Sequence, residues 1–373
     1  MGRGVFALLV GLALVIVAAV VAVGVLATEL LRAPAAPHAP RPSVVPTPRY
    51  ATAADVLDGE VIVVGGVRRG DAGDETVALV EAYDPETRTW TRCAPLATPR
   101  AFAAAAAYRG RLYVFGGLDA SGATLSSVEA WDPATDTWTA CPPMEIALSR
   151  LAATRHMDAG VVLYGGLRAD MTNGDEGLYF GVFGYGNTWR RWGPLLPMAR
   201  HGLGLVDADD RTERMLAVGG YDESGPTDRV DWWGVGRVHV RDAEGRLLHP
   251  GVKVRDGIRG TTHALDQDYD GYGWWDGPAL HQARGFHGVA RIGKLVYAVG
   301  GRCARIPPTE VLDLDDLAAG WRTAAPLPKD LCRFALVAWE GHLLAFGGET
   351  ESGRAINADV LDYDPAADTW SVR

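Results

Sequence analysis

Lysine is nearly absent from this sequence, where it occurs only at Lys253, Lys294 and Lys329. Acidic residues outnumber basic ones by 46 to 36, which gives a formal net charge of −10. Because phosphate binding needs clustered positive charge, we expect no nucleic acid among the partners. Cysteine is also rare, and four residues in a chain of 373 are too few for a disulfide scaffold. Intrinsic disorder is excluded, since 48% of the residues are hydrophobic.

An uncharged apolar run covers residues 5–27. As a helix, these 23 residues span about 34 Å, which exceeds a hydrocarbon core of about 30 Å. A secretory signal peptide has a shorter apolar region, so the run predicts a transmembrane helix that acts as an uncleaved signal anchor. The alternative is a cleaved signal peptide that ends at Ala27. Because the N-terminal flank is very short, we expect a single-pass membrane protein with the rest of the chain outside the cytoplasm.

Residues 28–48 are predicted to form a proline-rich linker. Six prolines fall between positions 34 and 48. Such a stretch is extended and semi-rigid, with a length of about 3 Å per residue. We therefore expect a spacer between the membrane helix and a globular domain over residues 49–373.

From Arg49 onward the chain repeats three landmarks six times. An apolar strand ends in a glycine pair, and the second glycines are Gly66, Gly117, Gly166, Gly220, Gly301 and Gly348. An Asp-Pro pair follows in units one, two and six, as at Asp84-Pro85. A tryptophan completes each unit, at Trp90, Trp138, Trp189, Trp274, Trp321 and Trp370.

A period of about 50 residues with such landmarks is typical of a unit of four short strands. The glycine pair allows a backbone turn that a Cβ atom would block. Aromatic residues of the third and fourth strands are expected to pack between neighbouring sheets. One four-stranded unit cannot bury both faces alone, whereas six units around an axis can. The predicted fold class is therefore all-β, a six-bladed β-propeller.

These motifs resemble the kelch repeat, and the resemblance covers residues 49–373 in six units. The double glycine, the Tyr-Asp-Pro of the first unit and the spaced tryptophan carry the resemblance. Because the repeat begins at a first strand and ends at a fourth, we expect the propeller to close by packing blade one against blade six, with no borrowed strand. The resemblance does not select a function, because kelch propellers include both binding modules and enzymes.

Blade four contains about 32 extra residues, at about 234–273. The insertion ends with carboxylates at alternate positions followed by glycine, which is the opening of a calcium loop. The predicted ligands of this calcium ion are Asp266, Asp268, Asp270, Tyr272 and Asp276. The glutamate expected at the twelfth position is missing, so the alternative is an Asp/Gly-rich turn without metal. Calcium, in a structural role, is the cofactor that the sequence suggests.

An arginine opens the first strand of every unit. These six residues are Arg49, Arg100, Arg150, Arg200, Arg284 and Arg333. Their spacings to the first glycine of the pair are 16, 16, 15, 19, 16 and 14 residues. Strand entries lie at the mouth of a propeller's central channel, so we expect a ring of guanidinium groups that suits a carboxylate, as in a sialic acid or an acidic peptide. The structural alternative is that these arginines bond loop carbonyls or neighbouring carboxylates.

Two cysteines occupy loops that share one face of a propeller. Cys303 follows a glycine pair, and Cys332 precedes Arg333. A disulfide between Cys303 and Cys332 is predicted, and an oxidising compartment would permit it.

The sequence thus predicts a membrane-anchored, extracytoplasmic binding module of the kelch type. Its expected partner is a protein or carbohydrate of the cell envelope, bound at the channel mouth beneath an overhanging insertion from blade four. The alternative is a carbohydrate-active enzyme that resembles the exported kelch sialic-acid epimerase. We find no nucleophile motif, P-loop or dinucleotide fingerprint, and we favour binding over catalysis.

Overall fold

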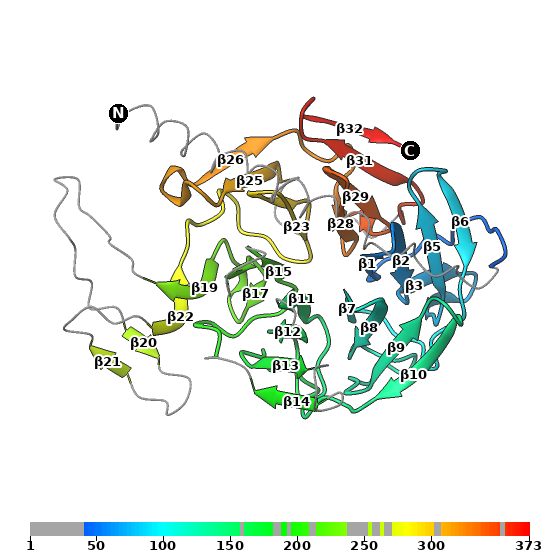
Figure 1. The fold of residues 1–373 in the computed structure, drawn as a ribbon, viewed down its shortest axis with the longest axis horizontal. Coiled ribbons are helices and arrows are strands. Elements are labelled where there is room, and N and C mark those ends of the chain that lie inside the picture. Colours follow the sequence, from blue (N-terminus) through cyan, green and yellow to red (C-terminus); the bar gives the residue numbers. More distant parts are fainter. Residues whose placement is uncertain are drawn as a thin grey trace, which may run out of the picture. The chain divides into compact units, whose positions relative to one another are not determined.

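The computed structural model describes residues 41–156, 160–181, 188–191, 195–208, 214–236, 253–255, 262–264, 271–301, 307–350 and 355–373. They form six four-stranded antiparallel sheets arranged around an axis, which confirms the predicted all-β, six-bladed propeller (Figure 1). Among these residues, no helix has the length and hydropathy of a membrane span. The predicted transmembrane helix over residues 5–27 lies outside the described part of the chain.

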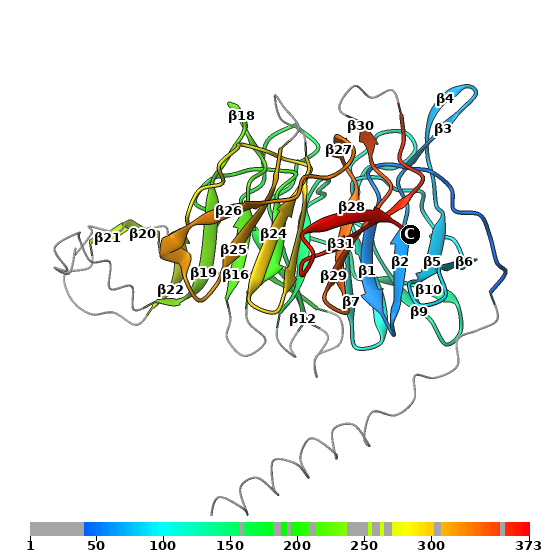
Figure 2. The same ribbon diagram turned by 90° about the horizontal axis from the view of Figure 1, so that it is seen from above.

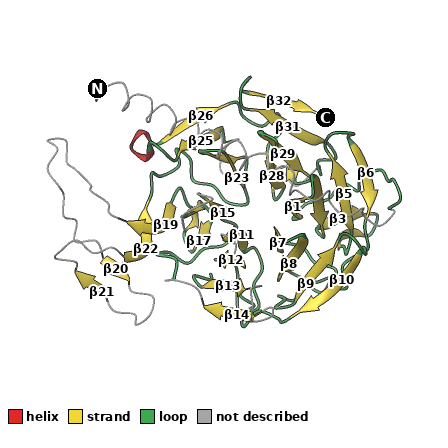
Figure 3. Cartoon of the chain, viewed as in Figure 1, coloured by secondary structure: helices red, strands yellow, loops and turns green. Residues whose placement is uncertain are grey.

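Each blade consists of four strands in chain order (Figure 3). Blade one contains β1 (Ala53–Leu57), β2 (Glu60–Val64), β5 (Val80–Asp84) and β6 (Thr89–Arg92). Blade two contains β7 (Ala104–Tyr108), β8 (Arg111–Phe115), β9 (Val128–Asp132) and β10 (Thr137–Cys141). Blade three contains β11 (Ala152–His156), β12 (Gly160–Tyr164), β13 (Gly177–Gly181) and β14 (Thr188–Arg191).

The second half of the chain builds the other three blades in the same way. Blade four contains β15 (Gly204–Asp207), β16 (Met215–Val218), β19 (Val230–Gly236) and β22 (Gly271–Asp276). Blade five contains β23 (Gly288–Ile292), β24 (Leu295–Val299), β25 (Thr309–Asp313) and β26 (Trp321–Ala324), with the 3-10 turn η1 (Leu317–Ala319) before β26. Blade six contains β28 (Ala335–Trp339), β29 (His342–Phe346), β31 (Val360–Asp364) and β32 (Thr369–Val372).

Three two-stranded ribbons extend the loops of one face, which we call the ribbon face (Figure 2). They pair β3 (Val67–Gly70) with β4 (Gly73–Thr76), β17 (Tyr221–Asp222) with β18 (Gly225–Pro226), and β27 (Leu331–Cys332) with β30 (Glu349–Thr350). The ribbon face holds the connections from second to third strands and from each blade to the next.

The hydrophobic core lies between neighbouring sheets. One cluster joins blades two and three, where the ring of Phe180 meets those of Tyr113 and Phe115 at centroid distances of 5.5 and 5.8 Å. The spaced tryptophans lie in the fourth strands, as predicted. Several of them form hydrogen bonds to the neighbouring blade. The indole N–H of Trp138, for example, donates to the carbonyl of Ala94 after blade one, at 2.8 Å.

The glycine pairs adopt the turns that the sequence predicts, and they also bring neighbouring blades close together. In blade two, Gly116 and Gly117 have φ angles of 57° and 101°, a region that favours glycine. A Cβ atom on Gly116 would lie 2.2 Å from the carbonyl oxygen of Leu148 in the next blade. The N–H of Gly117 donates to that same oxygen at 2.9 Å. Equivalent bonds from the second glycine cross the other five blade junctions.

Blade one packs against blade six with no strand borrowed between their sheets, as expected. Packing begins before the predicted boundary at Arg49. The N–H of Val44 donates to the carbonyl of Trp90, and the N–H of Arg92 donates to the carbonyl of Pro42, at 3.0 and 2.9 Å. The last residues of the predicted linker therefore lie along the outer edge of β6, which they cover.

The insertion of blade four joins its third and fourth strands. β19 and β22 pair as far as Gly236 and Gly271, so the inserted segment is 237–270. Its described part is a ribbon of β20 (Lys253–Arg255) and β21 (Thr262–Ala264). Connections from third to fourth strands leave a sheet at the end opposite its glycine pair. The insertion therefore leaves its sheet on the face opposite the ribbon face. Most of its residues lie outside the described part of the chain, and the expected overhang above the channel mouth stays a prediction.

Candidate functional site: the channel mouth

A closed circle of six backbone hydrogen bonds surrounds the channel on the ribbon face. One residue from each blade donates its N–H to the carbonyl of the equivalent residue in the preceding blade, over 2.7–2.9 Å. We call these the ring residues: Ala51, Phe102, Arg150, Gly202, Phe286 and Arg333. All six have φ between 53° and 60°. The strained left-handed backbone of five non-glycine residues is held because each blade fixes the next.

Four of the predicted arginines lie two residues before the ring and are buried inside their own blades. Arg100 is representative, since its guanidinium bonds the Glu129 carboxylate at 2.5 Å and the carbonyls of Gly116 and Ser127 at 3.0 and 3.1 Å. The other three ion pairs are Arg49–Glu81, Arg200–Asp231 and Arg284–Glu310. These four arginines therefore bond loop carbonyls and neighbouring carboxylates, which is the structural alternative to a ligand-binding ring.

In blades three and six the equivalent position is leucine. Leu148 and Leu331 accept the interblade bond that Arg100 and its counterparts accept elsewhere. Their partner in the third strand is also leucine, Leu178 in blade three and Leu361 in blade six, and each pair shares an apolar cluster. The short spacings of 15 and 14 residues in units three and six were the sign that Arg150 and Arg333 occupy a later position.

Arg150 and Arg333 are themselves ring residues, so they face the channel mouth. The Arg333 Cζ atom lies over the rings of Phe286, Phe102 and Tyr50, at 5.3, 5.5 and 5.9 Å from their centroids. The Arg150 Cζ atom lies 5.1 Å from the Phe102 centroid. Phe102 and Phe286 come from opposite blades, and their rings meet edge to face at 6.0 Å. The guanidinium groups of Arg150 and Arg333 thus pack on an aromatic cluster at the channel mouth. We call the rings of Tyr50, Phe102 and Phe286 the aromatic cluster.

A histidine, His201, lies beside this aromatic cluster. The His201 ring stacks on Tyr221 at 5.7 Å and contacts Phe286 at the same centroid distance. Its Nδ1 atom is 2.7 Å from the Oδ1 atom of Asn173. Burial, reinforced by the charge of Arg150, lowers the pKa of His201 to about 4. The imidazole is therefore neutral at physiological pH.

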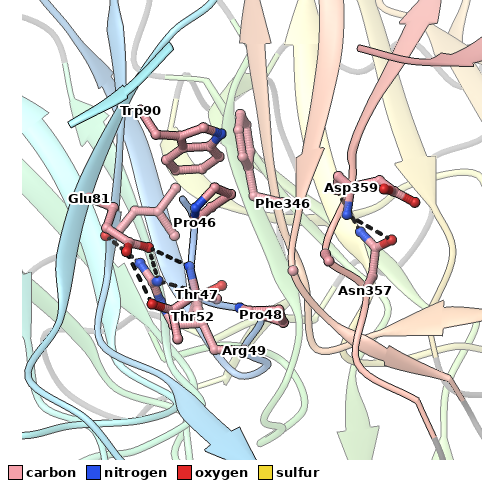
Figure 4. Close-up of a pocket in the computed structure, with 13 residues that line it drawn as sticks. Pro46, Thr47, Pro48, Arg49, Thr52, Glu81, Trp90, Phe346, Asn357 and Asp359 are labelled. Atoms are coloured by element: carbon pink, nitrogen blue, oxygen red, sulfur yellow. Dashed lines mark hydrogen bonds and ion pairs between the residues drawn. The ribbon is translucent and has the colours of Figure 1, made fainter. Parts of the chain in front are cut away.

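A small pocket lies on the ribbon side of the junction between blades one and six (Figure 4). Pro46 approaches Trp90 and Phe346 there, and Thr47 donates from its backbone N–H to the buried Glu81 carboxylate at 3.3 Å. Glu81 also pairs with Arg49. Thr47, Arg49 and Glu81 bond to one another here, as expected of a structural contact between the N-terminal stretch and blade one.

The predicted calcium ligands are described only in part. Asp266, Asp268 and Asp270 lie outside the described residues, whereas Tyr272 lies in β22, with its backbone opposite Val235. The Asp276 carboxylate pairs with Arg229 at 2.6 Å. The described residues contain no cluster of three metal-ligating side chains. The calcium site stays a prediction.

The predicted disulfide is also untested. Cys332 is buried in β27, where its backbone pairs with Glu349, and Cys303 lies outside the described residues.

The kelch motif model matches residues 48–97 and 99–145, which are the first two units. An F-box/kelch-repeat protein of Arabidopsis thaliana is 46% identical over 69 residues, 18% of this chain and 18% of its own. Kelch-like protein 36 of Bos taurus is 27% identical over 104 residues, 26% of this chain and 17% of its own. An influenza virus NS1A-binding protein homolog of Mus musculus is 43% identical over 61 residues, 16% of this chain and 9% of its own.

The matched stretches thus span less than a fifth of these relatives' lengths. Among solved structures, that of YjhT superposes with a TM-score of 0.66 at 15% identity, and covers 88% of this chain and 98% of its own. At that identity the likeness shows the fold alone.

Proposed function

Because this chain carries kelch motifs on a six-bladed propeller, we propose that it is a protein-interaction module whose partner binds across the ribbon face. Kelch propellers generally act as interaction modules. The name of one relative records binding to a viral protein. The observation that carries the proposal is the channel mouth, where Arg150 and Arg333 lie over Phe102 and Phe286. Arginine and aromatic residues dominate the energetic centres of protein interfaces.

The loops around the mouth add exposed contact area to the proposed interface. Met171, in the second-to-third connection of blade three, is 70% exposed with φ of 66°. Methionine is common at adaptable binding surfaces. The β3–β4 ribbon presents Arg68 and Glu75, which pair with each other at 2.7 Å. Such exposed pairs contribute little to stability, so they are free to exchange partners.

A photocrosslinking residue placed on each face of the full-length chain tests this assignment. Position 171 reports on the ribbon face, and Ala134, in the turn between β9 and β10, reports on the opposite face. We expect a specific crosslinked partner from position 171, lost when Arg150 and Arg333 are both replaced by glutamine. Crosslinking of the same partner from position 134 alone would contradict the proposal.

We further propose that residues 5–27 anchor the protein in a membrane and hold the propeller outside the cytoplasm. The length of the uncharged run supports this proposal. The full chain should then resist alkaline extraction from membranes, whereas a chain without residues 5–27 should be released. Recovery of the full chain in the soluble fraction would contradict anchoring.

An enzymatic alternative has one candidate residue, His201, whose ring lies against Tyr221 and Phe286 at the channel mouth. A neutral imidazole can accept a proton from a bound sugar acid. Proton NMR of N-acetylneuraminic acid with the protein tests this alternative. Accelerated interconversion of its anomers, lost in His201→Gln, would favour the enzyme, and an unchanged rate would leave the interaction module.

A further inference from the structure

The channel mouth has an internal two-fold pattern. In chain order the ring residues are a small residue, phenylalanine and arginine, twice over. The positions two residues earlier are Arg49, Arg100 and Leu148 in the first half, and Arg200, Arg284 and Leu331 in the second. Blades one to three and four to six therefore present equivalent half-sites, in which Arg150 corresponds to Arg333. The two half-sites can be compared position by position.

They differ in the side chain that faces the arginine. In the second half-site, Cys332 pairs with Glu349 across the two-stranded ribbon, and the Glu349 carboxylate bonds Arg333 at 2.5 Å. In the first half-site, Ser149 pairs in the same way with Leu167. Leu167 and Glu349 both follow directly after a glycine pair. Leucine thus occupies the place from which the second half-site supplies its carboxylate.

Arg150 consequently lacks the counter-charge that its counterpart has. Among the described residues, no carboxylate forms an ion pair with Arg150, whereas Arg333 pairs with Glu349. The buried Nε atoms of both arginines have no hydrogen-bond partner. Its contact is with the face of Phe102. Arg333, the other guanidinium of the mouth, adds positive charge, and burial with this repulsion lowers the pKa of Arg150. A half-buried cation without an anion is costly, and an incoming anion would remove that cost.

We propose that Arg150 binds a carboxylate of the partner protein, an aspartate or glutamate side chain that takes the place Glu349 takes beside Arg333. This inference rests on the proposed function, because the ribbon face must be the binding surface. The chemistry is that of a charge-assisted bond between planar guanidinium and carboxylate groups. The Phe102 ring gives an apolar contact beside it. An acidic residue next to an apolar one is therefore the expected recognition element.

The two half-sites also suggest the sharpest test. Leu167→Glu would build into the first half-site the carboxylate that the second one contains, and so would compete with an external carboxylate for Arg150. Leu167→Gln is the matched control, with the same shape and no charge. Position 349 shows that a buried glutamate is accommodated at the equivalent place when an arginine faces it.

The probes are fluorescein-labelled, capped peptides with one central glutamate and varied neighbours, alongside a matched set with glutamine. Fluorescence anisotropy measures their binding to the full-length protein. We expect a glutamate peptide whose affinity falls about ten-fold to a hundred-fold on change to glutamine, as for loss of a charged hydrogen bond. The same loss should occur in Leu167→Glu, and Leu167→Gln should bind as the parent does.

Glu349→Gln provides a second readout that does not depend on the folding of a new buried charge. It releases Arg333 from its internal partner, so glutamate peptides should bind more tightly and glutamine peptides should not. The carboxylate proposal is overturned if no peptide distinguishes glutamate from glutamine, or if Leu167→Glu binds glutamate peptides normally. If crosslinking from position 171 persists in that case, the interaction function stands without the carboxylate.

Discussion

The pairing of Arg100 with Glu129 gives a quantitative prediction about stability. Every blade has either a buried arginine with a buried acid or two leucines at these positions. The arrangement in blade three, Leu148 with Leu178, shows which apolar pair the fold accepts. We therefore consider the single changes Arg100→Leu and Glu129→Leu together with the double change.

Each single change leaves the remaining charged side chain, Glu129 or Arg100, buried without its partner. Arg100 is 1% and Glu129 4% exposed, so neither group can recover its solvation. Removal of one partner of a buried ion pair costs about 3–5 kcal/mol. Loss of Glu129 also leaves the backbone N–H groups of Ala97 and Thr98 without the carboxylate that accepts from them, at 2.7 and 3.3 Å.

The double change removes both charges and copies blade three. Replacement of a whole buried ion pair by apolar residues is often neutral or stabilising. The carbonyls of Gly116 and Ser127 lose the Arg100 donors, which costs about 1–3 kcal/mol. The double variant also leaves the N–H groups of Ala97 and Thr98 without the Glu129 carboxylate. Because no charge is left unpaired, we expect the double variant to lose clearly less stability than the sum of the two single losses.

Urea unfolding followed by tryptophan fluorescence measures the three free energies of unfolding. Equal slopes against urea concentration are the control that the unfolded state is unchanged. The reasoning is refuted if the double variant loses the sum of the two single losses, because the two side chains would then act independently.

Three further predictions concern packing and pH. Gly116→Ala should lower Tm by several degrees and Gly110→Ala by less, because a Cβ atom would strike a carbonyl at 2.2 Å in the first case and meet nothing within 4 Å in the second, with φ positive in both; equal losses by calorimetry would contradict this. Trp138→Phe should cost about 1 kcal/mol in urea unfolding through loss of its interblade hydrogen bond, and an unchanged midpoint would show that the bond adds nothing. Burial lowers the folded pKa of His201 to about 4 and that of His287 to about 3, so the unfolded chain binds more protons and stability should fall as pH drops from about 6.5 towards these values. His287→Phe should flatten that part of the Tm-against-pH curve, and an unaltered slope would refute the assignment.

The six-bladed architecture could be predicted from local sequence landmarks. The arrangement of residues at the channel mouth could not. The glycine pairs and fourth-strand tryptophans recur in every unit because every blade must turn and pack in the same way. The ring of backbone bonds joins residues of different blades, so no local pattern reveals it. Arg150 and Arg333 resemble Arg100 in sequence, yet they lie two residues later in register and are half-buried at the channel mouth.

The packing of the proline-rich stretch illustrates the same limit. Pro42 and Val44 lie against β6 because that edge strand has unpaired backbone groups. Composition predicts an extended chain there, and the chain is extended. What composition does not contain is the presence of an open edge beside it. Knowledge of the neighbouring strand is needed to see that the stretch is docked.

The most direct test of the account follows Arg150 itself. With nitrogen-15-labelled arginine, the Nε–H resonance that disappears in Arg150→Lys belongs to this side chain. We predict that this resonance moves when a binding glutamate peptide is added, and that it stays in place with the glutamine peptide, as does the resonance of the buried Arg100 with either. Movement with both peptides, or with neither while the glutamate peptide binds, would contradict a carboxylate site at Arg150.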